Sequence, residues 1–491
     1  MFRILSGVRF CCAFLLSTSC VCAPFYAARA ETDDLPELGA SASAGLPWSL
    51  EKRIGQDIMN QIRQTEPSYL DDPEIEDYLN RLGNRLAAVT PDAGNLHFFG
   101  VKDPSINAFA MFGGYVGVNT GLILNTQSES ELAGVLAHEI SHVTQRHLAR
   151  GLEKQKQVSV ANMLVMALAI LAANSNANLA EAAMTTGTAG AIQAQLNFSR
   201  AFEREADRSG FQTLVKAGFD PRGMSAFFER LQKATRAYEN NATVYLRTHP
   251  LTTERISDMQ NREQGVPYRQ VADSLDYHLV RARLQAQDGV PAEAVARFRA
   301  ALAEKRYASL AATQYGLAVA LERQKDGHGM EKALADARAA GGQSALIARL
   351  EAEARLMQGD VAGGLARYKD AINRYPAALA LVSGYAEALL AAGRFKEGVA
   401  FLDARLRGAP DADARLYRLK ARFHAIQGET AQQHQALAEA YAREGALDAA
   451  IEQLERAQKS PGGDFYVQST IDARLRQLKR QKAEEKPLAL P

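Results

Sequence analysis

Cysteine is missing from almost the whole of this 491-residue chain, because its four cysteines all lie within the first 22 positions. They are Cys11, Cys12, Cys20 and Cys22. Downstream of them the sequence offers no disulfide, no thiol nucleophile and no thiolate ligand. Any metal site in that part must therefore use histidine and carboxylate side chains.

The N-terminal segment that holds the cysteines has the pattern of a secretory signal peptide. Two arginines precede an apolar run over 10–22, and Ala28-Arg29-Ala30 then fits a small-residue cleavage site. The run is shorter than the roughly 20 residues that a spanning helix needs, which disfavours an uncleaved anchor. A lipid anchor is a weaker alternative, since Cys20 has no leucine three positions before it. We predict cleavage after Ala30 and secretion across the inner membrane.

An excess of positive charge is missing as well. Residues 1–30 contain three of the 57 basic residues and none of the 56 acidic ones, so the mature chain carries a net charge of −2. A chain without a basic field has little to attract nucleic acid, and we expect no nucleic-acid partner.

Apolar runs long enough to cross a membrane are also missing downstream of the signal. The stretch 158–173, VSVANMLVMALAILAA, is apolar on every face but falls short of a span. It is either a buried helix or a hairpin arm that makes peripheral contact with a membrane or a hydrophobic client. The residues after it, 174–197, are rich in Asn, Ala, Thr and Gly and are typical of a loop.

Residues 31–269 combine helical patterns with a few strand patterns. We expect helices from about Leu50, over 73–89, from Ser128 and over 199–218. Aromatic and β-branched residues over 96–119 indicate strands joined by a glycine turn. This part is therefore predicted to be α+β, mainly helical with a small sheet.

From about residue 270 to 483 the pattern is all helical, with a short tail over 484–491. Turn glycines recur at Gly359, Gly393 and Gly428, at the period of a tetratricopeptide repeat. A generic helical bundle is the alternative. Stacked repeats form a curved solenoid whose groove binds peptides or partner proteins, so this region is predicted to recruit and not to catalyse.

The segment LAHEISHVTQRH contains the motif His138-Glu139-Ile140-Ser141-His142. On a helix the two histidines face the same way and can hold one zinc ion, with Glu139 beside the open coordination position. We predict that Glu139 is the general base of a hydrolytic site with one zinc ion per chain. His147 lies at the wrong spacing for a third ligand, and we expect it at the surface or behind a ligand.

The third ligand is predicted downstream, in SRAFEREADRSG. Glu203 and Asp207 are four residues apart on a predicted helix, the arrangement of gluzincin-type metalloproteases. Glu203 would bind the zinc ion, and Asp207 would hydrogen-bond a ligand imidazole and fix its tautomer. Glu205 would point elsewhere on the helix and be solvated.

A possible substrate strand precedes the zinc-binding helix. It comprises Gly114, Tyr115, Val116, Gly117 and Val118. As an edge strand it would pair with an extended substrate and hold the scissile amide over the metal. The alternative is that these residues form an internal hairpin.

These motifs resemble those of CAAX-prenyl-protease-type and heat-shock-membrane-protease-type metallopeptidases. Together with the signal peptide and the repeats, they resemble the β-barrel assembly-enhancing proteases of the Gram-negative periplasm. The resemblance implies zinc ligation by His138, His142 and Glu203, with Glu139 as base. It also implies two roles in the periplasm: degrading stalled outer-membrane proteins, and assisting their assembly at the barrel-assembly machinery. The expected partners are that machinery and unfolded barrel proteins.

His249 stands in YLRTHPLTTERI, directly before a proline, and is therefore expected at the end of an element. It either occupies the fourth zinc position and blocks hydrolysis, or donates to the oxyanion, or has no role. The resemblance favours the gate, because a histidine at the matching position acts as a zinc-bound switch in that family.

Two other functional classes remain as alternatives to a periplasmic zinc endopeptidase. One is a chaperone or adaptor whose gated zinc site is mostly idle. The other is a membrane-embedded prenyl-protein protease, which the signal peptide and the lack of a 20-residue apolar run disfavour.

Overall fold

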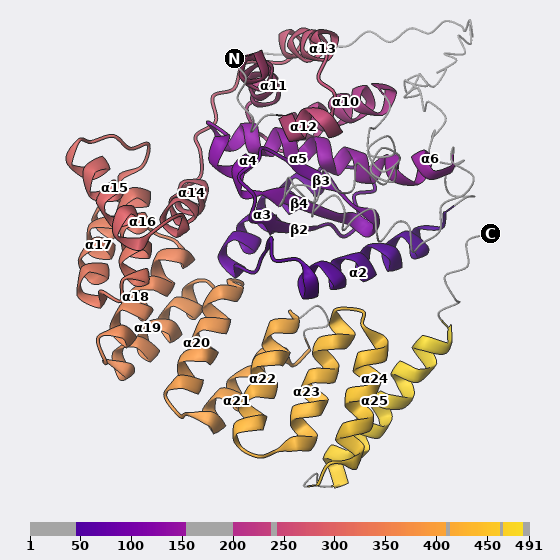
Figure 1. Ribbon diagram of the computed structural model, residues 1–491, viewed down its shortest axis with the longest axis vertical. Coiled ribbons are helices and arrows are strands. Elements are labelled where there is room, and N and C mark those ends of the chain that lie inside the picture. The colour runs from indigo at the N-terminus through magenta and orange to yellow at the C-terminus, as the bar shows by residue number, and fades with distance from the viewer. Residues whose placement is uncertain (1–45, 154–199, 237–242, 409–412, 462–464, 485–491) are drawn as a thin grey trace, which may run out of the picture.

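The computed structural model describes residues 46–153, 200–236, 243–408, 413–461 and 465–484. Its N-terminal part joins helices to one small sheet, and its C-terminal part is a curved array of helices (Figure 1). The predicted fold class, α+β followed by an all-α solenoid, is confirmed.

Four predictions concern residues outside this description. They are the signal peptide over 1–30, the apolar stretch 158–173, the loop over 174–197 and nearly all of the tail over 484–491. Within the described ranges, no helix is both long and apolar enough to span a bilayer.

The sheet has four strands in the order β1-β2-β4-β3. Their bounds are Tyr69–Leu70 for β1, His97–Val101 for β2, Ala108–Ala110 for β3 and Tyr115–Asn119 for β4. β2 and β4 are parallel, whereas β1 and β3 pair antiparallel with their neighbours. The predicted glycine turn precedes β4, where Gly113 and Gly114 have φ of 74° and 87°, a region that favours glycine.

The expectation that Gly114–Val118 forms an edge strand is wrong. β4 pairs with β2 on one side and with β3 on the other, so the edge strands of the sheet are β1 and β3. The chain turns back at Gly113-Gly114 and places β4 between two strands that come before it. Sequence patterns identify the strands but not their lateral order, because that order depends on long-range pairing.

Nine described helices accompany the sheet in the N-terminal part. They are α2 (Trp48–Thr65), α3 (Pro73–Ala87), α4 (Thr120–Asn125), α5 (Glu129–Thr144), α6 (His147–Glu153), α10 (Arg200–Lys216), α11 (Arg222–Arg236), α12 (Thr243–Thr248) and α13 (Thr253–Gln264). The Ser128 hydroxyl caps α5 by accepting from the Glu131 N–H at 3.2 Å, as the capping pattern predicts. α5 is buried along most of its length, which explains why its apolar residues occupy every face.

The sheet is covered on both faces. Phe98, Val116 and Val118 belong to a core cluster with α3 and α5, and Phe99 and Phe109 belong to a second one with α2. α5 contacts β3, α10 and α11, so the sheet and these two helices fix its position. The zinc-motif helix therefore lies in the centre of a rigid core.

Twelve described helices follow in antiparallel succession. They are α14 (Leu275–Gln287), α15 (Pro291–Ala303), α16 (Leu310–Arg323), α17 (Gly327–Ala339), α18 (Ala345–Met357), α19 (Val361–Arg374), α20 (Leu379–Ala391), α21 (Phe395–Leu406), α22 (Ala414–Ile426), α23 (Thr430–Arg443), α24 (Leu447–Lys459) and α25 (Phe465–Glu484). The predicted turn glycines Gly359, Gly393 and Gly428 all have positive φ, between 70° and 83°. The repeat prediction is confirmed.

The solenoid does not stand apart from the rest. One core cluster runs from α3 and α5 through α14 to α18, so the first repeats share their apolar core with the N-terminal part. The acidic start of α3 also lies against the solenoid, where its carboxylates pair with arginines. The pairs are Arg283 with Asp72 (Nε–Oδ2 2.7 Å) and Glu74 (Nη1–Oε2 2.7 Å), Arg349 with Glu74 (Nε–Oε1 2.9 Å), and Arg415 with Glu76. We call these residues, with Asp77, the α3 clamp.

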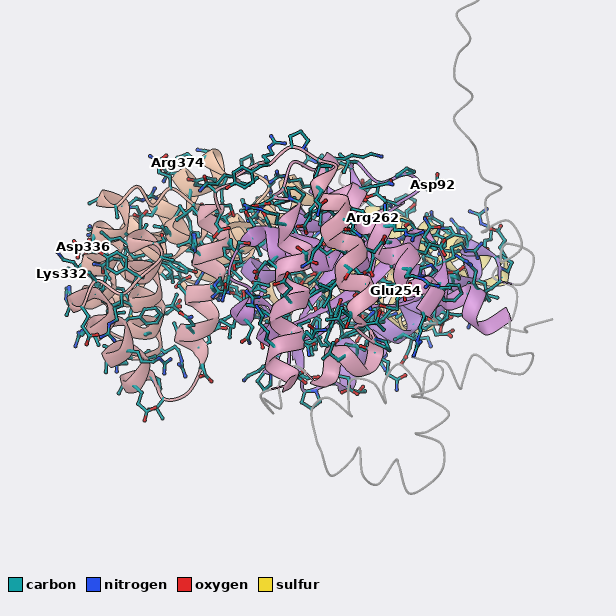
Figure 2. All side chains as sticks on the ribbon, turned by 90° about the horizontal axis from the view of Figure 1, so that it is seen from above. Asp92, Glu254, Arg262, Lys332, Asp336 and Arg374 are labelled. Carbon is teal, nitrogen blue, oxygen red and sulfur yellow. The ribbon has the colours of Figure 1, made fainter. Side chains whose placement is uncertain are left out.

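The outer surface of the solenoid differs from its inner one. Figure 2 shows Lys332, Asp336 and Arg374 at the margin of the molecule, pointing away from the sheet-containing part. Between α2, the sheet and α22–α23 lies a cavity of about 1090 Å³, lined among others by Arg63, Tyr115 and Arg418. The solenoid thus presents solvated charge outside and holds α3 inside.

Candidate metal centre

His138 and His142 project from one face of α5, as their spacing predicts. Both side chains are buried, and their Nε2 atoms lie 3.0 Å apart. Two imidazole nitrogens at this distance in a dry core need a common partner, either one proton or one cation.

Two further groups complete the cluster from other elements. Glu203 comes from the first turn of α10, and His249 lies directly after α12, at an element end as expected. Ligand atoms of His138, His142, Glu203 and His249 all lie within 4.8 Å of one another. We call these four residues the metal cluster.

The separations within the metal cluster fit one small cation. His138 Nε2 lies 3.4 Å from His249 Nδ1, His142 Nε2 lies 3.4 Å from Glu203 Oε1, and His249 Nδ1 lies 3.1 Å from that same oxygen. Four ligands bonded at the usual zinc distances form a tetrahedron with edges of roughly 3.3–3.4 Å. The separations of 3.0–3.4 Å lie close to these edges, and the widest, up to 4.8 Å, must shorten for all four ligand atoms to bind one tetrahedral ion.

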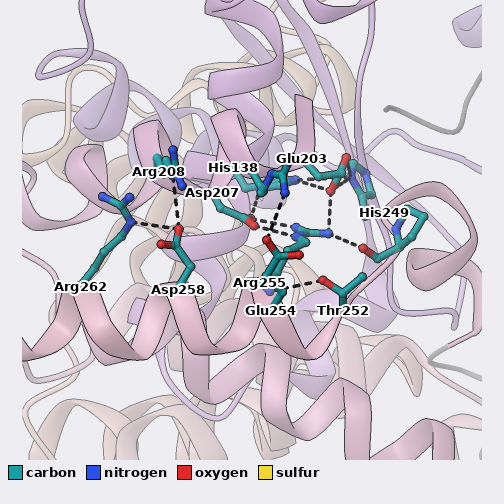
Figure 3. A network of polar contacts seen from close by, with 12 residues as sticks. His138, Glu203, Asp207, Arg208, His249, Thr252, Glu254, Arg255, Asp258 and Arg262 are labelled. Atoms are coloured by element: carbon teal, nitrogen blue, oxygen red, sulfur yellow. Dashed lines mark hydrogen bonds and ion pairs between the residues drawn. The ribbon is translucent and has the colours of Figure 1, made fainter. Parts of the chain in front are cut away.

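Asp207 lies behind His138, as predicted. Its Oδ1 is 3.0 Å from His138 Nδ1, so the imidazole is held with Nε2 toward the cluster (Figure 3). Asp207 accepts two hydrogen bonds from Arg255, at 2.6 and 2.8 Å. This buried pairing lowers the pKa of Asp207 despite its desolvation.

Arg255 is a functional candidate that sequence reasoning missed. It starts from the first turn of α13 and is almost fully buried. Its guanidinium also lies 2.8 Å from Glu203 Oε2 and donates to the Pro250 carbonyl at 2.8 Å (Figure 3). One side chain thus fixes a metal-cluster carboxylate, Asp207 and the residue after His249. Its position six residues after His249 was the only signal.

His147 and Glu205 lie behind His142. His147 Nδ1 is 2.8 Å from His142 Nδ1, and the side chain is fully buried, which decides between the two expectations for it. Glu205 was expected to be solvated, and it is only partly so: its side chain is 28% exposed, its Oε2 lies 3.3 Å from His147 Nε2, and it accepts from Arg150 at 3.1 Å. Although burial opposes it, hydrogen bonding to His147 and Arg150 lowers the pKa of Glu205 to about 2.

Glu139 is buried beside the metal cluster but is not one of its four members. Its Oε2 accepts a hydrogen bond from the Ala110 N–H at 3.1 Å, and its Oε1 lies 3.5 Å from His249 Nε2. Burial raises the pKa of Glu139, which suits a group that must take up a proton. It therefore lies between the edge strand β3 and the cluster.

The charges of the cluster are coupled. Burial lowers the pKa of His142, whereas burial of His138 is outweighed by Asp207 and Glu203, which raise the pKa of His138 to about 10. His138 therefore holds a proton more firmly than a free imidazole does, because Asp207 and Glu203 both face it. A divalent cation would replace that proton, because ligand histidines must be neutral.

The chain is similar in sequence to known proteins. The family model for peptidase family M48 matches residues 71–263, and a tetratricopeptide-repeat model matches residues 355–423. The chain is 33% identical to the β-barrel assembly-enhancing protease of Escherichia coli, over 95% of both chains. A relative from Vibrio cholerae is 42% identical over 61% of this chain and 63% of its own length. The mitochondrial metalloendopeptidase OMA1 of Arabidopsis thaliana is 28% identical over 43% of this chain and 41% of its own.

Proposed function

Because the chain belongs to the family of β-barrel assembly-enhancing proteases, we propose that it is a periplasmic zinc endopeptidase. Its clients would be outer-membrane β-barrel proteins that stall or misassemble, and it would also assist their assembly. The observation that carries the proposal is the convergence of four ligand atoms within 4.8 Å, with the Glu139 carboxylate beside them.

We assign the metal to His138, His142 and Glu203, with His249 as a removable fourth ligand. Zinc fits the two-histidine, one-carboxylate donor set, and when bound it supplies a Lewis acid that activates water. Glu139 would take up a proton from the attacking water and deliver it to the leaving amine nitrogen. Asp207 holds His138 in the tautomer that presents Nε2 to the metal.

The substrate would pair with β3. Phe109 faces Gly117 in the ladder with β4, and the Ala110 N–H instead points to Glu139, so Ala108 and Ala110 direct their backbone groups away from β4. An extended polypeptide along this edge would have its scissile amide beside Glu139. Backbone pairing is largely independent of sequence, which suits unfolded barrel strands as clients.

His249 would act as a gate. Its Nδ1 is 3.1 Å from Glu203 Oε1, which places it among the ligand atoms and favours the gate over an oxyanion donor. His249→Ala should then raise proteolysis of an unfolded barrel protein. If His249 stabilises the oxyanion, the same variant should lose roughly a hundredfold in turnover.

The repeats would recruit the barrel-assembly machinery. We keep 31–269 as the protease region and 270–483 as the repeat region, although one core cluster spans both. Deleting the repeats would expose that shared core, so recruitment is better tested in the full chain. A photo-crosslinking residue at Phe465, which is 90% exposed, should capture components of the machinery. A crosslinker at Tyr268, which is 65% exposed in the protease region, is the matched control.

The decisive experiment compares the wild-type chain with Glu139→Gln. The variant should keep one zinc ion per chain and its fold but lose turnover of an unfolded barrel protein by roughly 100- to 10,000-fold. Retained turnover would contradict the proposal. If wild type shows no turnover while both chains support barrel assembly equally, the alternative of a chaperone with an idle zinc site holds.

A further inference from the structure

The two metal-facing histidines are supported in different ways. His138 is backed by the Asp207 carboxylate, which is fully buried and paired with Arg255. His142 is backed by another imidazole, that of His147, which lies next to the partly exposed Glu205. Asp207 is accounted for by the metalloprotease pattern, whereas nothing in that pattern accounts for His147.

The contact between His142 and His147 restricts where the protons lie. His142 turns Nε2 toward Glu203 and His138, so its outward Nδ1 carries the proton. That N–H can be satisfied at 2.8 Å only if His147 Nδ1 accepts it. The proton of His147 is then on Nε2, which lies 3.3 Å from the Glu205 carboxylate. The contacts run from metal ligand to imidazole to carboxylate, the first as a hydrogen bond and the second as a close charged contact.

The backbone is shaped to bring His147 to this place. An unbroken helix would put a residue five positions after His142 on a different face. Instead α5 ends at Thr144, Arg146 takes a left-handed conformation with φ of 52°, and α6 begins at His147. The Arg146 Nε donates to Glu51 Oε1 at 2.8 Å, which anchors this strained residue.

The imidazole of His147 is also oriented from the other side. The ring of Phe202 stacks on it, with centroids 4.5 Å apart and an angle of 8° between the planes. Phe202 directly precedes Glu203 on α10, so one helix supplies a metal-cluster ligand, the stacking ring and the terminal Glu205. Arg150 from α6 holds the Glu205 carboxylate at 3.1 Å from both of its oxygens.

We propose that His147 is a positioning residue for metal binding: it fixes the tautomer and ring orientation of His142, and Glu205 in turn fixes His147. The inference rests on the metal site proposed above. The His138 arm is held by a buried ion pair, whereas the His142 arm ends at a carboxylate whose side chain is 28% exposed. Metal affinity would therefore depend on a residue close to the surface.

A pair of variants separates positioning from packing. His147→Phe keeps an aromatic ring for stacking on Phe202 but cannot accept the proton of His142. His147→Asn loses the ring, but its amide oxygen lies where Nδ1 was and accepts the same proton. With zinc alone as the probe, competition against a chelator should show a 10- to 100-fold loss of affinity for the Phe variant, and roughly a few-fold loss for the Asn variant.

Several outcomes would overturn the proposal. Equal affinity of His147→Phe and wild type would leave His147 as packing only. Equal losses of zinc affinity in both variants, together with lower thermal stability of the zinc-free chains, would also mean that His147 acts only through packing. Glu205→Gln is the second variant, since a half-buried position tolerates this change. If it leaves zinc affinity unchanged, Glu205 does not help to position His147. Failure of the metal site itself looks different, because the wild-type chain would then bind no zinc.

Discussion

The metal cluster and the α3 clamp are both buried networks of charge, yet they are built in opposite ways. Around the metal cluster, the carboxylates of Glu139, Glu203 and Asp207 face one guanidinium, that of Arg255. In the α3 clamp, three buried carboxylates face three guanidiniums. They are Asp72, Glu74 and Glu76 against Arg283, Arg349 and Arg415.

This difference distinguishes a binding site from a structural one. Within the α3 clamp, the charges of Asp72, Glu74 and Glu76 are balanced by those of Arg283, Arg349 and Arg415, with N–O distances of 2.7–2.9 Å for Arg283 and Arg349. These six residues need no added cation. The surroundings of the metal cluster carry two excess negative charges when the histidines are neutral. A buried excess of this kind is costly unless a cation is bound, and a divalent ion balances it. Both regions are buried and charged, so these two properties do not distinguish them. What distinguishes them is whether the negative charges are matched by positive ones.

The largest expected effect is on zinc binding and proteolysis, when one carboxylate in each region is replaced by alanine. Glu203→Ala should abolish stoichiometric zinc binding and reduce proteolysis by roughly a thousandfold or more, because a catalytic zinc needs three protein ligands. Glu74→Ala should keep both metal content and the chemistry of the site. Metal analysis of the two purified chains checks this, and wild-type zinc content with intact activity in Glu203→Ala would refute the ligand assignment.

The next effect is on stability, and it should be larger in the α3 clamp. Glu74→Ala leaves Arg283 and Arg349 buried without this partner, which costs about 3–5 kcal/mol of unfolding free energy. The exposed pair Arg374–Asp370 provides a control, since Asp370→Ala should cost less than about 1 kcal/mol. Urea unfolding of both variants measures the difference. Similar costs would mean that the clamp is not what holds the solenoid to α3.

Metal removal should affect one region only. A ligand that binds the folded state at a thousand times its dissociation constant adds about 4 kcal/mol of stability, so chelation should lower the melting temperature. The Arg283, Arg349 and Arg415 pairs have no need of metal and should remain formed. Hydrogen exchange with and without chelator would locate the change: loss of protection at α5 and α10 is expected, and equal loss at α3 would contradict the comparison.

The smallest effect is a pH dependence within the α3 clamp. Burial raises the pKa of Asp77 from 3.8 to about 6, so its contribution to stability is present below pH 3.8 and lost as the pH rises through 6. Asp77→Asn, whose amide oxygen can still accept from the Leu379 N–H, should therefore stabilise the chain by about 1–2 kcal/mol at pH 7 and by little at pH 4.

The contribution of Glu76 to stability depends on pH in the opposite direction to that of Asp77. Hydrogen bonds from His97 and Arg415 outweigh burial and lower its pKa from 4.5 to about 2, so its contribution is present above pH 4.5 and lost as the pH falls toward 2. Glu76→Gln should destabilise the chain at pH 7. Urea midpoints of both variants between pH 3 and 7 measure the two slopes; slopes of equal sign would contradict the assignment.

Some of this molecule follows from short-range rules alone. His138 and His142 are four residues apart on one helix, as are Glu203 and Asp207, so their side chains share a face wherever those helices go. The turn glycines of the repeats and the Ser128 cap are equally local. His249 lies at an element end because Pro250 follows it. The candidate ligand pairs and the repeat architecture were therefore predictable from spacing.

The tertiary structure decided the rest, because those features join segments that no spacing relates. Glu74 and Arg349 are 275 residues apart in the chain, and Asp207 and Arg255 are 48 apart. β3 became an edge strand only through its pairing with β4, and His147 reached His142 only through the left-handed turn at Arg146. Local periodicity sets which face of an element a side chain occupies. What lies opposite that face depends on how distant elements pack.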